Sequence, residues 1–322
     1  MRAEKKIDVI YVTASTRDAR FTRICVASIR HFYPNAPVKL LIGGELEEGL
    51  VEELARYWDV GMSDVPPGQW GWGFVKLEPL FGPCGERFLV LDSDTVFAGK
   101  VLETWANCDG HFLVDDEHQT EADTRRLYYD WRKVAAVDPA ARSPQFVFNS
   151  GQWFGTAGQL SREDFAPFID WSSMPPKLRH AELFMPGDQG VLNYVINQKI
   201  ALDSLAVARH KIMRWPGNGM DDLSVEAVKC GKAPPLVIHW AGMKAIFLRN
   251  MVGADLLNFY EAIYFSRLPM GHVRRALALW RHVWIHWTFS MSLLFRLRLQ
   301  RLVKLLRPEK AAPIIVTTPV DS

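Results

Sequence analysis

The apolar residues of the chain recur in two alternating patterns, one typical of strands and one typical of helices. Short, β-branched apolar runs at 7–13, 37–42 and 87–91 predict buried strands. Between them, 20–32 and 46–57 carry apolar residues at helical spacing. Strands that alternate with helices predict an α/β fold, in which helices cover both faces of a mostly parallel sheet.

A ligand is expected at the carboxyl ends of these strands, because open α/β sheets bind ligands in the crevice at that edge. Thr13 and Asp92 each stand at the end of a predicted strand. Further along, we interpret the polar segment 116–142 as a helical insertion that contributes to an acceptor region. The segments 146–154 and 236–240 return to a strand-like composition.

The segment 276–295 is twenty mostly apolar residues with three tryptophans at near-helical spacing. It is about long enough to cross a bilayer, but Arg281, His282 and His286 favour a helix that lies in the membrane interface. Amphipathic helices packed back on the body, or bound in the groove of a partner protein, are alternative interpretations.

The charges are divided unevenly along the chain. Of the net charge of +2, nine positive charges fall within 262–308, which contains no Asp or Glu, and the rest of the chain carries −7. We therefore predict that 261–307 is a basic amphipathic helical tail that associates with anionic lipid headgroups, and that 308–322 is a flexible C-terminus. Leucine and tryptophan dominate the tail, so nucleic acid is not an expected partner.

The four cysteines show no paired or zinc-like spacing, so we expect neither a disulfide framework nor a structural zinc site among the 322 residues. The first apolar run is too short for a secretory signal. Both observations favour a cytoplasmic location.

The segment from Arg87 to Asp94 reads Arg-Phe-Leu-Val-Leu-Asp-Ser-Asp, so two carboxylates follow a buried strand two residues apart. At that spacing the side chains of an extended chain point the same way. Hard oxygen ligands suit Mg²⁺ or Mn²⁺ and leave coordination positions for phosphate oxygens. We interpret Asp92 and Asp94 as candidate metal ligands, with a solvated turn as the alternative.

A second candidate segment, 237–244, places His239 at the end of an apolar run. A neutral imidazole there can bind a metal. Gly242 lets backbone amides approach a phosphate, and Lys244 supplies a positive charge for it. On this segment alone, a histidine packed in the core is the simpler interpretation.

Five motifs in their order along the chain resemble the retaining GT-A glycosyltransferases of family 8. They are an N-terminal strand, a strand ending in Asp-x-Asp, Phe148-Asn149-Ser150-Gly151, Gly187-Asp188-Gln189-Gly190 and a final His-x-x-Gly-x-Lys. The resemblance spans about 7–250. It implies a Rossmann-like fold of the GT-A type and a nucleotide-sugar donor.

The resemblance also implies roles for individual positions. The implied metal ligands are Asp92, Asp94 and His239. The implied contacts to the donor come from Thr13, Lys76, Ser93, Asn149, Gly242 and Lys244. Asp188 and Gln189 are the candidate catalytic residues, because a carboxylate or an amide near the anomeric carbon can stabilise an oxocarbenium-like centre.

The sequence departs from the family pattern in two places. The family usually has Lys six residues after the His, followed by Pro-Trp, whereas Lys244 stands five residues after His239 and is followed by Ala245-Ile246. The family also usually has Asp directly after the first strand, whereas the first one here is Asp18. These departures leave the shape of the diphosphate site and the bound base open.

Together these patterns predict a catalytic domain over 1–260 that uses Mn²⁺ or Mg²⁺ and transfers a hexose from UDP-hexose, with retention. The expected acceptor is a glycan or a lipid-linked acceptor, such as a lipopolysaccharide or glycolipid precursor. The tail predicts peripheral attachment to the cytoplasmic face of the inner membrane. A nucleotidyltransferase on a similar fold, and a non-catalytic membrane adaptor with a degenerate GT-A domain, are the alternatives.

Overall fold

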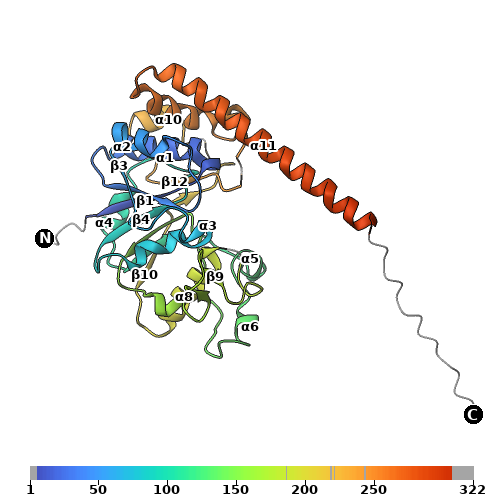
Figure 1. Cartoon of the computed structure of the whole chain (residues 1–322). Coiled ribbons are helices and arrows are strands. Elements are labelled where there is room, and N and C mark those ends of the chain that lie inside the picture. The colour runs from blue at the N-terminus through green and yellow to red at the C-terminus, as the bar shows by residue number, and fades with distance from the viewer. Residues whose placement is uncertain (1–5, 186, 218–219, 221, 243, 307–322) are drawn as a thin grey trace, which may run out of the picture.

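The computed structural model describes residues 6–306 except 186, 218–219, 221 and 243, and for 293–306 it describes the helix without its side chains. The C-terminus that we predict to be flexible, 308–322, lies outside the described residues. Figure 1 shows an α/β body from which one long helix projects.

A seven-stranded sheet runs through the body in the order β10-β6-β7-β4-β1-β2-β3. Its strands are β1 (Val9–Ala14), β2 (Val38–Ile42), β3 (Val60–Met62), β4 (Arg87–Leu91), β6 (Phe112–Asp115), β7 (Gln152–Thr156) and β10 (Val207–His210). Neighbouring strands are parallel except at β7, which is antiparallel to β4 and β6. The predicted, mostly parallel sheet is confirmed.

Successive residues of β4 point to opposite faces of the sheet. Leu89 and Leu91 pack in one hydrophobic core with α1 (Ala19–Phe32), α2 (Leu50–Trp58) and α10 (Ala254–Ser266). Phe88 and Val90 pack in a second core with the 3-10 helix η2 (Val75–Phe81) and α8 (Asp188–Ala201). Figure 1 shows α1, α2 and α10 on one side of the sheet and α8 on the other. Both faces are covered, which explains why β4 is apolar from Phe88 to Leu91.

Shorter elements complete the described body. The helical ones are η1 (Thr16–Asp18), α3 (Gly71–Phe74), α4 (Leu102–Ala106), α5 (Glu121–Leu127), α6 (Trp131–Val134), α7 (Arg162–Phe165), α9 (Val225–Lys229) and η3 (Leu248–Asn250). A two-stranded ribbon is formed by β8 (Ile169–Asp170) and β9 (Lys177–Leu178). Both α5 and α6 fall within 116–142, the segment that we interpret as a helical insertion.

A small three-stranded sheet brings a late segment of the chain to the end of β4. In it, β12 (Val237–His239) lies between β11 (Met213–Arg214) and β5 (Thr95–Phe97), and His239 stands opposite Thr95. Since β5 directly follows Asp94, this pairing places His239 beside the Asp-x-Asp turn.

The helix predicted at 46–57 is present, but it begins at Leu50. Gly49, directly before it, has a left-handed φ of 75°, which a helix does not continue through. The residues before Gly49 therefore form a connection between β2 and α2 and not a first helical turn.

The strand predicted at 146–154 is mostly a loop, because β7 begins only at Gln152. The backbone of the preceding residues is bonded to side chains of α8 and not to a neighbouring strand. Asn193 accepts a hydrogen bond from the amide of Phe148 at 2.8 Å and donates one to its carbonyl at 2.9 Å. A buried asparagine thus satisfies both backbone groups that a sheet partner would otherwise bond.

The predicted tail is one continuous helix, α11 (Gly271–Leu306), which begins against α10 and leaves the body (Figure 1). Its first turns are attached by ion pairs between arginines of α11 and carboxylates of the body. The pairs are Arg274 with Glu53 (3.3 Å), Arg275 with Glu261 (2.6 Å) and Arg281 with Glu47 (3.4 Å). The predicted domain boundary at 260 falls inside α10.

Candidate active site

Two strand ends and one turn form the floor of the site. The register pairs Val12 of β1 with Leu91 of β4, so the residues that follow them lie side by side. Thr13 donates a hydrogen bond to Asp92 at 3.4 Å and accepts one from the amide of Ser93 at 3.2 Å. The first strand therefore fixes the conformation of the Asp-x-Asp turn.

Asp92, Asp94 and His239 form a compact cluster at this edge of the sheet. One possible ligand atom from each lies within 4.8 Å of the others. His239 Nε2 is 3.2 Å from Asp94 Oδ1 and 3.8 Å from Asp92 Oδ2. These three predicted ligands are thus brought together, although 145 positions separate His239 from Asp94 in the chain.

The donor set of this cluster fits a divalent cation. His239 is buried, and neither of its ring nitrogens has a hydrogen-bond partner among the described residues. A buried polar atom without a partner is costly, so an uncompensated imidazole next to two carboxylates indicates a ligand. Two hard carboxylate groups with one imidazole suit Mn²⁺ or Mg²⁺. The indole of Trp215 stacks on the imidazole, with ring centroids 5.2 Å apart, and holds its orientation.

Lys244 lies on one side of the cluster despite its short spacing from His239. Its amino group is 3.1 Å from Asp94 Oδ2 and 2.6 Å from Asp18 Oδ1. Burial opposes the charge on the lysine, but the two carboxylates outweigh it, so the pKa of Lys244 is raised. Burial likewise opposes the charge on Asp94, but His239 and Lys244 hold the pKa of Asp94 well below its ordinary value. Gly242, with a left-handed φ of 69°, lies in the exposed turn between His239 and Lys244.

Lys76 lies on the other side of the cluster, on η2. Its amino group is 3.2 Å from Asp92 and 3.3 Å from Asp188. Burial opposes the charge on Lys76, yet Asp188 and Asp92 raise the pKa of the lysine. Burial raises the pKa of Asp188; the charge of Lys76 opposes this rise, and the negative charge of Asp92 adds to it. Lys76 therefore links the cluster of proposed metal ligands, through Asp92, to Asp188, the first residue of α8.

Asn149 and Gln189, which we predict near the transferred sugar, form hydrogen bonds that hold the loop facing Lys76. Gln189 accepts a hydrogen bond from the amide of Ser150 at 3.2 Å and donates one to the carbonyl of Leu127 at 3.0 Å. Asn149 accepts a bond from the amide of Gly151 at 2.8 Å. Gln189 thus joins the loop before β7 to the segment that carries α5.

Two residues of the site were not predicted. Asp18 was noted only because it came too late after the first strand, but η1 folds back so that Asp18 reaches Lys244. Trp215 lies in the sequence without a motif around it, and only its stacking on His239 reveals it. A carboxylate that follows a strand by a few residues, such as Asp18, can be recognised in the sequence as a candidate site residue. An isolated tryptophan such as Trp215 cannot.

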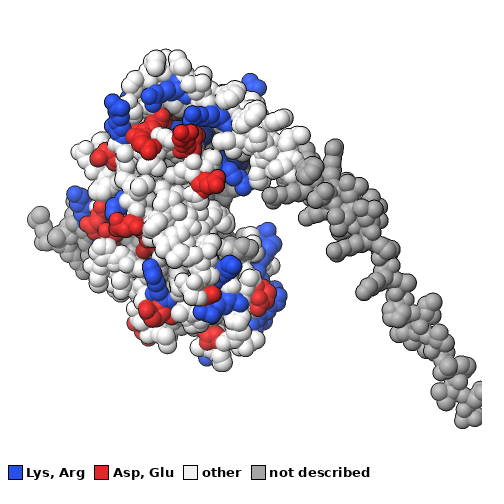
Figure 2. Space-filling view, viewed as in Figure 1, with Lys and Arg blue, Asp and Glu red and all other residues white. Residues whose placement is uncertain are grey.

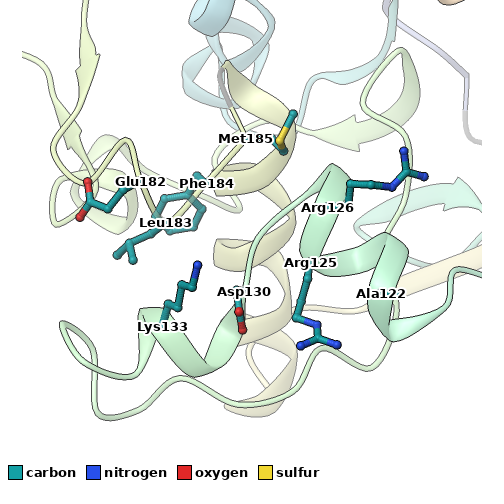
Figure 3. Close-up of a pocket in the computed structure, with 9 residues that line it drawn as sticks. All are labelled: Ala122, Arg125, Arg126, Asp130, Lys133, Glu182, Leu183, Phe184 and Met185. Carbon is teal, nitrogen blue, oxygen red and sulfur yellow. The ribbon is translucent and has the colours of Figure 1, made fainter. Parts of the chain in front are cut away.

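A pocket of about 410 Å³ lies between α5, α6 and the segment 182–185, which leads toward Asp188. Figure 3 shows Lys133 pointing into this pocket, while Arg125 and Arg126 point in different directions. The cations therefore do not converge on one point, and the pocket does not form an anion site. The acceptor role predicted for 116–142 stays a prediction.

No family model and no curated protein matches this sequence. Among solved structures, the chain is similar to the galactosyltransferase LgtC in complex with donor and acceptor sugar analogs, with a TM-score of 0.53 and 13% identity over 80% of this chain and 95% of that one. An active-site mutant of LgtC gives a TM-score of 0.51 and 13% identity over 79% and 95% of the two chains. The sheet order, the metal-ligand cluster and this likeness agree: the chain has the fold of the GT-A glycosyltransferases.

Proposed function

We propose that this chain is a metal-dependent glycosyltransferase that takes a hexose from a nucleotide-diphosphate sugar, most simply UDP-hexose, with retention. The observation that carries the proposal is the convergence of Asp92, Asp94 and His239 between two lysines at the carboxyl edge of a GT-A fold. The similar galactosyltransferase LgtC was solved with donor and acceptor sugar analogs. The same edge of the sheet is where an α/β fold accommodates such a ligand.

In this proposal, Asp92, Asp94 and His239 hold Mn²⁺ or Mg²⁺. When bound, the cation supplies a Lewis acid that offsets the negative charge of the donor diphosphate. Lys244 provides a second positive charge at the same place, and the exposed turn at Gly242 leaves room for a phosphate to approach the backbone.

The remaining predicted residues divide between the two ends of the donor. Thr13 and Ser93 lie at the strand end, where they suit the nucleoside and ribose. Lys76 and Asn149 lie toward α8, where the transferred sugar would sit, and Lys76 would stabilise negative charge on the leaving oxygen. This order follows the contacts from Asp92 through Lys76 to Asp188.

We assign Asp188 and Gln189 to the anomeric carbon. Asp188 is held by Lys76, and one of its carboxylate oxygens has no hydrogen-bond partner among the described residues. The amide of Gln189 is fixed by its bonds to Ser150 and Leu127, so its dipole keeps one orientation next to Asp188 without a further loss of side-chain freedom. Both groups can stabilise an oxocarbenium-like centre on the face opposite the leaving group.

Exposed tryptophans of α11 support peripheral membrane contact and a lipid-linked acceptor. Trp280, Trp284 and Trp287 are 63%, 54% and 55% exposed. Their rings follow one another along the helix, with centroids 6.1 and 5.5 Å apart. Aromatic side chains of this kind favour the headgroup region of a bilayer.

Figure 2 shows no charged side chains on the part of α11 that leaves the body, up to the residues drawn in grey. Within the described chain, no helix combines the length and apolar character needed to cross a bilayer. The arginines and lysine of 296–307 that would meet anionic lipid have no described side chains, so their part stays a prediction. We place the enzyme on the cytoplasmic face of the inner membrane.

The test is the release of nucleotide from a panel of nucleotide-sugars with Mn²⁺, Mg²⁺ or EDTA. We expect nucleoside diphosphate to be released from one donor, only when a divalent cation is present. Release of pyrophosphate from a nucleoside triphosphate would indicate a nucleotidyltransferase instead. The absence of both turnover and donor binding with every cation would contradict the proposal and favour the adaptor.

A further inference from the structure

Trp72 is exposed where the body of the protein otherwise buries its tryptophans. It lies on the short helix α3 and is 69% exposed, whereas Trp58, Trp105 and Trp153 are fully buried. In the described part of the chain, it is the one exposed tryptophan outside α11. Burying an indole in the core contributes strongly to stability, so the exposure of Trp72 indicates a role other than core packing.

The backbone of Trp72 is held tightly although its ring is free. A Cβ atom on Gly43, directly after β2, would lie 2.8 Å from the Cα of Trp72. A Cβ atom on Gly73 would lie 3.1 Å from the Cα of Gly187. Only glycines allow α3 to sit this close to both the sheet and the start of α8. The backbone from which the indole projects is therefore fixed by the fold.

The indole faces the residue that precedes the proposed catalytic carboxylate. A Cβ atom on Gly187 would lie 3.5 Å from Cζ3 of the Trp72 ring. Asp188 follows Gly187 and pairs with Lys76, which in turn pairs with Asp92 of the metal cluster. Trp72 thus stands at the far end of a chain of contacts that begins at the metal ligands and passes the place proposed for the transferred sugar.

A pocket of about 430 Å³ opens beside this indole, between α3 and the β8–β9 ribbon. Its lining is mostly apolar and includes Trp70, Trp72, Phe74 and Pro175, with Lys177 as its one charged residue. Sites for small molecules commonly have about 300–1,000 Å³ and an apolar lining of this kind.

We propose that the indole of Trp72 is the platform on which a pyranose ring of the acceptor stacks. The face of an indole is electron-rich, and one face of a pyranose presents C–H groups, so the two surfaces attract and exclude water from each other. A ring stacked there would lie beside Gly187, the residue that precedes Asp188. This inference rests on the proposed glycosyltransferase function and adds to it the residue that binds a pyranose ring of the acceptor.

The test separates the acceptor from the donor. In the full-length protein, nucleoside diphosphate released without an acceptor reports donor binding and cleavage, and the added release with a saccharide reports transfer. A panel of soluble methyl hexosides and disaccharides serves as acceptors. We expect Trp72→Ala to raise the acceptor KM about tenfold, while Trp72→Phe restores most of the affinity, and donor hydrolysis stays within about twofold of wild type.

Trp284→Ala is the matched control, because it removes an exposed tryptophan from α11 and should leave both rates with soluble acceptors unchanged. An unchanged acceptor KM in Trp72→Ala would overturn the inference. The inference would also be overturned if Trp72→Ala lost donor hydrolysis to the same extent as transfer. The same holds if the wild type cleaves the donor but uses none of the saccharides as an acceptor. Absence of any donor cleavage in the wild type would instead contradict the proposed function itself.

Discussion

Gly151 and His239 touch so closely that the glycine has no room for a side chain. A Cβ atom on Gly151 would lie 2.2 Å from Cε1 of His239, a distance that real atoms do not adopt. The imidazole is buried and stacked on Trp215, so it has little freedom to move aside. The glycine of the 148–151 motif thus helps to position His239, the proposed metal ligand.

We therefore expect Gly151→Ala to displace His239 from the cluster. Affinity for Mn²⁺, measured by calorimetry or by the spin signal of the free ion, should fall by about tenfold or more, because one of the three protein ligands moves. Gly44→Ala is the control, since nothing lies within 4 Å of a Cβ atom at Gly44. Wild-type Mn²⁺ affinity in Gly151→Ala would show that His239 is not a ligand.

Lys244 should contribute to donor binding more than to folding. Lys244→Met removes a charge that faces Asp94 and Asp18, and a charge-assisted contact to a diphosphate is worth about 1.5–3 kcal/mol. The donor KM should rise by roughly tenfold to a hundredfold, as measured by nucleotide release.

Lys232→Met, at an exposed lysine, controls for the loss of one positive charge. Lys244→Arg should recover part of the affinity, because it keeps the charge but not the shape. A donor KM that is unchanged in Lys244→Met would remove this lysine from the diphosphate site.

His282 makes the stability of the folded chain sensitive to mild acid. Burial, with contributions from the nearby His286 and Arg20, lowers the pKa of His282 to about 4. Glu261 and Glu47 face the same ring and raise its pKa, but less than the other effects lower it. Between pH 6.5 and about 4 the unfolded chain binds a proton that the folded chain does not, so stability falls as the pH falls through that window.

The free energy of unfolding, measured with denaturant at pH 7 and pH 4.5, should therefore decrease more in the wild type than in His282→Gln. We expect the difference to be on the order of 2 kcal/mol. Equal pH dependence in the two proteins would mean that His282 is solvated and that α11 is not packed on the body as described.

The tryptophans of α11 should decide membrane attachment. In flotation with vesicles that contain phosphatidylglycerol, the wild type should float, and the triple variant Trp280→Ser, Trp284→Ser, Trp287→Ser should largely remain at the bottom. Trp72→Ala, which removes an exposed tryptophan from the body, should float like wild type. Equal flotation of the triple variant would exclude these tryptophans from the contact.

The structural features that can be predicted from the sequence are those that depend on short stretches of the chain. The strand of Arg87–Leu91 and the two carboxylates after it are visible because the period of a strand and the end of an apolar run are local. The metal role of His239 required the family resemblance, because its contact with Asp94 depends on the pairing of β12 with β5, far apart in the chain.

The parts that could not be predicted depend on long-range contacts without a local signal. The loop before β7 looks like a strand in composition, but side chains of α8, such as Asn193, form the hydrogen bonds that a neighbouring strand would otherwise form. The attachment of α11 depends in part on ion pairs between its arginines and carboxylates more than 200 positions earlier, namely Arg274 with Glu53 and Arg281 with Glu47. No short window of sequence contains both partners of either pair.

The most direct measurement of the central claim compares wild type with Asp94→Asn for nucleoside diphosphate release from a nucleotide-sugar, with Mn²⁺ and with EDTA. Asp255→Asn, at an exposed carboxylate, is the control. The account predicts that release in the wild type requires the cation, and that Asp94→Asn lowers it by about a hundredfold or more while the protein stays folded. Release that is as fast in Asp94→Asn or in EDTA as in the wild type with Mn²⁺ would contradict it.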